Sequence, residues 1–433
     1  GTAGADTLER HTELCRYLQD QGQADAVATW IDAQTRNHRY GEADEAVEEA
    51  ERTGKVILNG FPIVHYGVTG TRKLIASIKV PAAVYANGPD LRLIAEIALA
   101  GGHTSTAIGG SLCAFWGYTS NMPPEMVMRN YQYHYRLEGC YQERGVPISV
   151  QIIGASSSNV NPSLYHTSAI IEALMAAEQG VRHFRFNPAQ SISGNIAQDV
   201  AGAVTIRKLA REYLDKFGYK DSRIYVGSYH PYGKFPEDDG QAFAIIGLSP
   251  LVGVLGACDI VFLRTIDEGR QIPRKEQNAS THRYVRMLLN MLKDQKLNML
   301  DNKAVMTEAD MLEREVRAIL DRVLEMGDGD VVIGSSRAME AGVLDMTFAS
   351  TQRTLSKVMA VRDAQGAVRY LDHGNLPFTS DIIEFHKEKI AERAVKEGKP
   401  VDYDTIIGDV FALSRGYFIS SSSWQDEEKA KSL

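Results

Sequence analysis

Short apolar segments recur along the chain about every 30 residues, and polar residues stand at or just beyond the downstream end of each. Such runs, bounded by turn residues and separated by helical patterns, are typical of buried strands in a parallel sheet. The eight segments are Ala26–Asp32, Val56–Asn59, Ala82–Asn87, Thr104–Ile108, Ile148–Ile153, His183–Asn187, Arg223–Ser228 and Asp259–Arg264. Eight strands alternating with helices predict an α/β fold, a (β/α)8 TIM barrel over residues 1–326.

The stretches between these segments carry apolar residues at helical spacing. Leu91, Ile94 and Ile97 form one such face, with Pro89 before it and Gly101-Gly102 as the stop. Helices are expected over residues 7–21, 89–100, 123–144, 163–179, 198–217, 275–297 and 307–326. The charge-free run Gln241–Cys258 contains Ser249-Pro250 and several glycines, which favours a buried helix leading into a strand over a membrane span.

The pattern changes after Gly327. Residues 330–378 are rich in turn residues, and Val358–Val361 and Val368–Leu371 flank Asp363–Gly366 as a β-hairpin. Helices are predicted over 380–398 and 403–414. We therefore expect a C-terminal α+β extension, residues 327–433, that packs on the barrel.

Composition narrows the class of protein. The net charge of −8 argues against a nucleic-acid partner, which would need a basic face. The four cysteines show no zinc-binding spacing, and so few thiols in 433 residues fit a reducing compartment. With no signal peptide at the start and no membrane span, the expected location is the cytoplasm.

In a TIM barrel the chemistry takes place at the carboxyl ends of the strands. Arg36, four residues after Asp32, suits a substrate carboxylate, although an internal ion pair with Asp32 explains it equally well. Thr69–Lys73 could cradle a phosphate, but an ordinary strand-to-helix connection is the simpler interpretation. The polar residues at the predicted strand ends are Asp32, Arg36, Asn59, Tyr85, Asn87, Gln151, Asn187, His230, Arg264 and Glu268.

The sequence offers little acid–base machinery of its own. The histidines are scattered one per segment without metal-ligand spacing, so no metal site is predicted. Neither a G-x-S-x-G elbow nor a G-x-G-x-x-G fingerprint is present. This combination favours chemistry supplied by a cofactor.

A set of short blocks gives the chain a family resemblance. The blocks are Arg16–Asp20, Asn59–Pro62, Tyr66–Val68, Pro89-Asp90, Ala176–Gly180, Phe235-Pro236, Gly342–Asp345, Val361–Asp363 and Gly374–Phe378. In this order they resemble the large (epsilon) chain of glutamate mutase, also called methylaspartate mutase, over essentially the whole length. The resemblance implies an isomerase: a (β/α)8 barrel that uses adenosylcobalamin, most of which is held by a small partner subunit with a D-x-H-x-x-G motif. The C-terminal extension and the barrel rim also offer surfaces for a homodimer.

The resemblance assigns two groups of residues. On the cofactor side the matching positions are Gly4, Asn59, Phe235, Arg264, Glu268 and Ile272. Arg264 stands where the family has a lysine, so a cation is kept, and Glu268 is expected to bond the ribose hydroxyls. With Arg36, these two are the implied catalytic residues.

The substrate side departs from the family, which binds a dicarboxylic amino acid with three arginines. Arg36 matches one arginine, whereas Thr2 and Tyr85 occupy the other two positions. Ala107 replaces an acidic residue, Cys113 a tyrosine and Gln151 a further carboxylate.

Each lost charge-assisted hydrogen bond is worth about 1.5–3 kcal/mol, and every ~1.4 kcal/mol is a tenfold change in affinity. We therefore expect a small substrate other than L-glutamate, with one carboxylate on Arg36 and a neutral group near Tyr85, Ala107 and Cys113. The alternatives are a barrel enzyme that no longer uses cobalamin, with His65, His103 or His230 as acid–base groups, and a non-catalytic binding relative.

Overall fold

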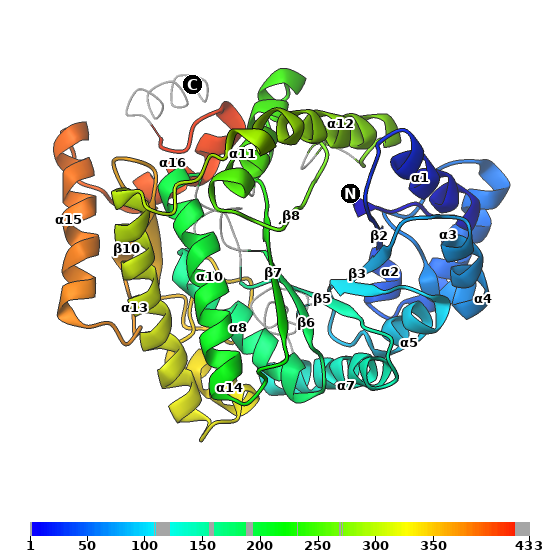
Figure 1. Cartoon of the computed structure of the whole chain (residues 1–433), viewed down its shortest axis with the longest axis horizontal. Coiled ribbons are helices and arrows are strands. Elements are labelled where there is room, and N and C mark those ends of the chain that lie inside the picture. Colours follow the sequence, from blue (N-terminus) through cyan, green and yellow to red (C-terminus); the bar gives the residue numbers. More distant parts are fainter. Residues whose placement is uncertain are drawn as a thin grey trace.

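A computed structural model of the chain describes residues 2–107, 109, 122–155, 160–187, 194–231, 233–267, 270 and 272–420. Eight parallel strands form one curled sheet in chain order, with helices packed around its outside (Figure 1). The strands are β1 (Thr2–Ala3), β2 (Val27–Trp30), β3 (Ala82–Tyr85), β4 (Ser105–Ala107), β5 (Ser149–Ile152), β6 (His183–Phe186), β7 (Arg223–Ser228) and β8 (Ile260–Val261). This arrangement confirms the predicted TIM-barrel class. β1 and β8 are the edge strands and are not paired with each other in the described residues.

The helices predicted before residue 327 are present in the order expected, together with three helices between residues 33 and 76 that were not predicted. They are α1 (Leu8–Asp20), α2 (Ala33–Arg36), α3 (Tyr40–Thr53), α4 (Ile63–Ala76), α5 (Arg92–Gly101), α7 (Pro124–Glu143), α8 (Pro162–Glu178), α10 (Ile196–Lys216), α11 (Asp239–Leu255), α12 (Lys275–Leu292) and α13 (Lys303–Met326). Side-chain caps fix several of their starts: Thr7, Asn161 and Asp238 each accept a hydrogen bond from a first-turn amide. Within the described part of the chain, no helix combines the length and apolar character needed to cross a membrane.

The predicted strand at Val56–Asn59 is wrong. Val56 and Ile57 are exposed (56% and 38%), so their apolar character does not reflect burial in a sheet. The loop that contains them meets the sheet only through a bridge between Ile31 and Phe61. The eighth strand of the sheet is instead β1, which pairs in parallel with β2. It was not predicted because only two of its residues lie in the sheet.

Two further expectations need correction. Thr69–Lys73 lies inside α4, beyond a kink at Gly67, so it is neither a phosphate loop nor a strand-to-helix connection. Part of the turn-rich region 330–378 is a helix, α14 (Val331–Ala341), which Asp330 caps with its carboxylate.

The C-terminal extension packs on the barrel through a common apolar core. Its other elements are the antiparallel hairpin β9 (Met359–Arg362) and β10 (Val368–Asp372), and the helices α15 (Ser380–Glu397) and α16 (Tyr403–Ala412). Val332, Met339 and Tyr370 belong to the same buried cluster as Phe184 and Leu209 of the barrel. As a result α8 is covered on every side, and all its residues from Pro162 to Ala177 are buried. The domain boundary at residue 327 stays a prediction.

Candidate functional site

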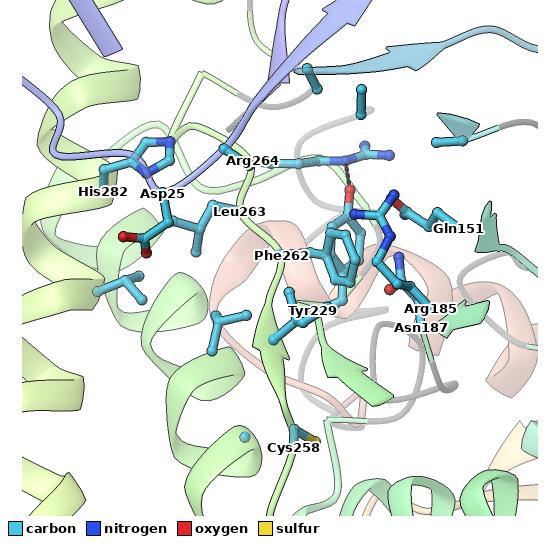
Figure 2. Close-up of a pocket in the computed structure, with 18 of the residues that line it drawn as sticks. Asp25, Gln151, Arg185, Asn187, Tyr229, Cys258, Phe262, Leu263, Arg264 and His282 are labelled. Carbon is cyan, nitrogen blue, oxygen red and sulfur yellow. Dashed lines mark hydrogen bonds between the residues drawn. The ribbon is translucent and has the colours of Figure 1, made fainter. Parts of the chain in front are cut away.

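A cavity of about 1110 Å³ lies inside the curled sheet and opens between its two edges. Gly4 lines it beside β1, and Arg264 and Ile272 line it beyond β8. Figure 2 shows Arg185, Asn187, Gln151, Tyr229 and Arg264 gathered on one side of this cavity, with Asp25 and His282 on the other. Its volume is at the upper end of the range for ligand pockets in proteins.

One layer of side chains crosses five neighbouring strands at the same register. Trp30, Tyr85, Ala107, Gln151 and Arg185 are successive partners from β2 to β6, and all five line the cavity. The Tyr85 hydroxyl donates a hydrogen bond to Oε1 of Gln151. The Trp30 ring lies 5.3 Å from the Tyr85 ring. The layer therefore joins an aromatic corner to a polar, positively charged one.

The next layer toward the amino ends of the strands consists of small residues. Ala28, Ala83, Ser105 and Ser149 follow one another in register. In most TIM barrels bulky branched residues fill this space. The small side chains leave room, and the cavity accordingly reaches down to Ala28 and Ala83.

Arg264 is held over an aromatic ring at the end of β8. Its Nε donates to the Tyr229 hydroxyl, and its guanidinium carbon lies 5.4 Å from the centre of the Tyr229 ring. His230 stacks on the same ring at 4.5 Å. Burial, and then the Arg264 charge, lower the pKa of His230 to about 3, so His230 is neutral. Arg264 is thus fixed in direction by neutral groups.

The cavity brings together most of the residues predicted from the sequence. The lining includes Gly4, Asn59, Tyr85, Ala107, Gln151, Arg264 and Ile272. Gly4 packs tightly, because a Cβ there would lie 3.0 Å from Cα of Gly60 and 3.2 Å from Cβ of Trp30. Cys113 and Glu268 lie outside the described residues. The roles assigned to all these residues stay predictions.

Two predicted residues do not line the cavity. Phe235 is fully buried and its ring lies 5.1 Å from the His230 ring. Arg36 is half-buried; its Nε donates to the carbonyl of Ile31 and its Nη1 to the carbonyl of Asn87, both at 3.0 Å. The structure therefore places Arg36 as a clamp between the ends of β2 and β3.

Arg185 was missed as a site residue. The segment His183–Asn187 alternates polar and apolar residues, and this period of two directs Arg185 and Asn187 to the same face of β6. This alternation is the signal that identifies Arg185 as a residue facing the barrel interior. It was missed because only residues at the strand ends were considered as site candidates. Burial lowers the pKa of this guanidinium from its usual value.

The histidines considered as acid–base groups lie elsewhere. His65 pairs with Asp44 near the surface at 2.7 Å, and buried His103 contacts the Thr29 hydroxyl at 3.2 Å. Neither they nor His230 line the cavity. In the part of the chain that the structure describes, no group of three His, Cys, Asp or Glu side chains is placed to hold a metal ion.

Comparison with known proteins agrees with this architecture. Residues 1–422 match the family model of the methylaspartate mutase E chain (MutE). The chain belongs to this family. It is 41% identical to the glutamate mutase epsilon subunit of Desulfitobacterium hafniense over 418 residues, 96% of this chain and 85% of the relative. The corresponding subunit of Treponema denticola is 37% identical with the same coverage, and that of Haloarcula marismortui is 35% identical.

Membership of the methylaspartate mutase E chain family sets the broad class of activity. The family comprises components of isomerases, the cobalamin-dependent mutases, and this chain belongs to that family. Its relatives are named as subunits, so each is one component of an enzyme with more than one chain.

Proposed function

We propose that this chain is the large component of an adenosylcobalamin-dependent carbon-skeleton mutase whose substrate is not L-glutamate. A single observation supports this most directly. The cavity at the strand ends combines the predicted cofactor positions Gly4, Asn59 and Arg264 at its rim with the neutral residues Tyr85 and Gln151 inside.

The residues present fit the cofactor. A cavity of about 1110 Å³ leaves room for an adenosyl group beside a small acid. Gly4 keeps the rim free of a side chain, and Tyr229 directs Arg264 toward the same space. Asn59 accepts a hydrogen bond from the Ala33 amide at 3.1 Å, which fixes its amide group at the rim.

When bound, adenosylcobalamin supplies the hydrogen-abstracting chemistry that such a rearrangement needs. The chain's own contribution is to orient the ligands and to exclude water, which the buried walls Ala107 and Tyr85 support. Arg264 and Glu268 are the proposed contacts to the adenosyl group, with Ile272 as an apolar neighbour; Phe235, predicted for the same role, does not line the cavity and contacts the His230 ring instead. A small subunit carrying D-x-H-x-x-G is the proposed partner, and a homodimer of this chain stays a further prediction.

The β3 to β5 part of the inner layer argues against a second carboxylate on the substrate. Tyr85, Ala107 and Gln151 are neutral and nearly fully buried, at 7%, 2% and 2% exposure. Tyr85 and Gln151 also satisfy each other by a hydrogen bond. A second buried carboxylate at this place would lose charge-assisted bonds worth about 1.5–3 kcal/mol each. By resemblance, Arg36 takes the one carboxylate that remains.

The proposal is tested with the chain mixed with a small D-x-H-x-x-G subunit and adenosylcobalamin. Light-sensitive cob(II)alamin, followed by visible and electron paramagnetic resonance spectra, should form only when a substrate is added. Absence of the signal with every candidate substrate would contradict cobalamin use and favour a barrel without cobalamin or a binding protein. Micromolar binding of L-glutamate by calorimetry would contradict the altered substrate.

A further inference from the structure

Arg185 is a half-buried cation with few partners among the described residues. Among the described residues its one hydrogen bond runs from Nη2 to the Ser105 hydroxyl, and its Nε is buried without a partner. Its guanidinium carbon lies 5.9 Å from the centre of the Phe262 ring. No carboxylate in the described part of the chain forms an ion pair with it, and none contributes to its pKa.

A half-buried guanidinium with a buried, unpartnered Nε is unusual, because charges withdrawn from water in proteins are normally paired. Desolvation lowers the pKa of Arg185, yet a guanidinium stays protonated in proteins. Within the described residues, this positive charge at a wall of the cavity therefore has no counter-ion. The missing counter-ion is one that a ligand can provide.

Asn187 supplies a second unsatisfied group on the same strand face. It is 5% exposed, lines the cavity, and among the described residues has no hydrogen-bond partner for Oδ1. In Figure 2, Asn187 and Arg185 lie next to each other and close to Gln151. Gly227 keeps this corner open, since a Cβ there would lie 3.1 Å from Oδ1 of Asn187 and 2.3 Å from the Phe262 ring.

We propose that Arg185 binds the substrate carboxylate and that Asn187 accepts a hydrogen bond from an amino or hydroxyl group beside it. The substrate class is then a 2-amino or 2-hydroxy monocarboxylic acid with an uncharged remainder against Ala107 and Tyr85. The inference rests on the proposed function and replaces Arg36 as the carboxylate anchor. Arg36 donates to two main-chain carbonyls, whereas Arg185 lines the cavity.

Calorimetry on the full-length chain tests the anchor with L-2-aminobutyrate and butyrate as probes. The wild type should bind L-2-aminobutyrate saturably, and Arg185→Gln should weaken this binding roughly 10- to 150-fold, the value of a charge-assisted bond. Arg185→Lys should restore part of it. Asn187→Ala should weaken L-2-aminobutyrate but not butyrate.

The matched control is Arg223→Gln, the same substitution at an exposed position that begins β7. It should leave probe binding unchanged. The proposal is overturned if the wild type binds neither probe, if Arg185→Gln binds as tightly as the wild type, or if Arg36→Gln alone abolishes binding.

The melting temperature of an Arg185 variant distinguishes a ligand-binding role of this residue from a structural one. An unpaired charge that is partly withdrawn from water costs folding free energy, so Arg185→Met should melt at or above the wild-type temperature. A clearly lower melting temperature would support a structural role and contradict the proposal.

The binding assay contains no cobalamin, so it fails or succeeds independently of the mutase proposal. Probe binding through Arg185 without any cob(II)alamin signal would leave the site standing and refute the mutase. Cob(II)alamin formation with an unchanged KM in Arg185→Gln would refute only the anchor.

Discussion

Tyr85 and Gln151 make contact across a strand that separates them. β3 and β5 both pair with β4, and between the two side chains stands Ala107, which has only a methyl group. The Tyr85 hydroxyl can therefore reach Gln151. One small residue thus permits a neutral pair to form where the family resemblance implies charged side chains.

This pair gives a prediction for Tyr85→Phe. Loss of the hydroxyl leaves buried Oε1 of Gln151 without this donor, so the free energy of unfolding should fall by about 1 kcal/mol. Urea denaturation measures the change. The control is Tyr133→Phe, because the Tyr133 hydroxyl bonds Glu96 at 45% exposure, and its effect should stay within about 0.5 kcal/mol. Equal losses in both variants would contradict the prediction.

At the scale of elements, the loop before α4 replaces the strand that the sequence suggested. Its hydrogen bonds include two at 2.7 Å, from the Phe61 amide to the Trp30 carbonyl and from the Ile57 amide to Asp6. Gly60 lies against the main chain just after β2, and a Cβ there would come within 2.6 Å of the Asp32 amide nitrogen. This contact places Asn59 at the cavity rim.

Gly60→Ala should therefore push the loop away from β2. Backbone atoms cannot yield as a flexible side chain can, so we expect a loss of about 1–3 kcal/mol in the free energy of unfolding. Thermal melting followed by circular dichroism measures it. Gly41→Ala is the matched control, since nothing lies within 4 Å of its Cβ position in α3, and its melting temperature should stay level or rise slightly. A Gly60→Ala protein as stable as this control would refute the close contact.

Across the whole molecule, burial of histidines couples stability to pH. Burial lowers the pKa of His11, His103, His134, His166, His230 and His282, to values of about 2 to 4. In the unfolded chain the same side chains accept protons below a pKa of ~6.5. The unfolded state therefore binds more protons between about pH 4 and 6.5, and stability falls as the pH falls through this window.

The expected result is a lower melting temperature at about pH 5 than at about pH 7. Each neutral buried histidine contributes roughly 1.4 kcal/mol per pH unit below its unfolded pKa. Glu138 acts in the opposite direction, because burial raises its pKa to about 8 and its contribution is lost as pH rises from 4.5. Six histidines outweigh one carboxyl group. A melting temperature that is equal or higher at the lower pH, at constant ionic strength, would contradict the histidine assignment.

Much of this architecture could be predicted, and the failures have local causes. The helices were found because apolar spacing and caps such as Asn161 and Asp238 act within one turn. The strand predicted at Val56–Asn59 was wrong because an exposed apolar run in a loop has the same hydrophobic pattern in the sequence as a buried strand. For the site, strand-end residues such as Tyr85, Gln151 and Arg264 were found, whereas Arg185, inside a strand, was not.

The sequence by itself determined the order of strands and helices, the family, and the residue types at the strand ends, since these depend on neighbouring positions or on short motifs. Only the tertiary structure decided that Arg36 clamps backbone carbonyls, that Tyr85 reaches Gln151 across Ala107, and that Arg185 stands at the cavity wall with no carboxylate partner among the described residues. Each of these findings depends on which groups from distant segments of the chain lie next to one another. Such contacts arise only when the strands are brought into register.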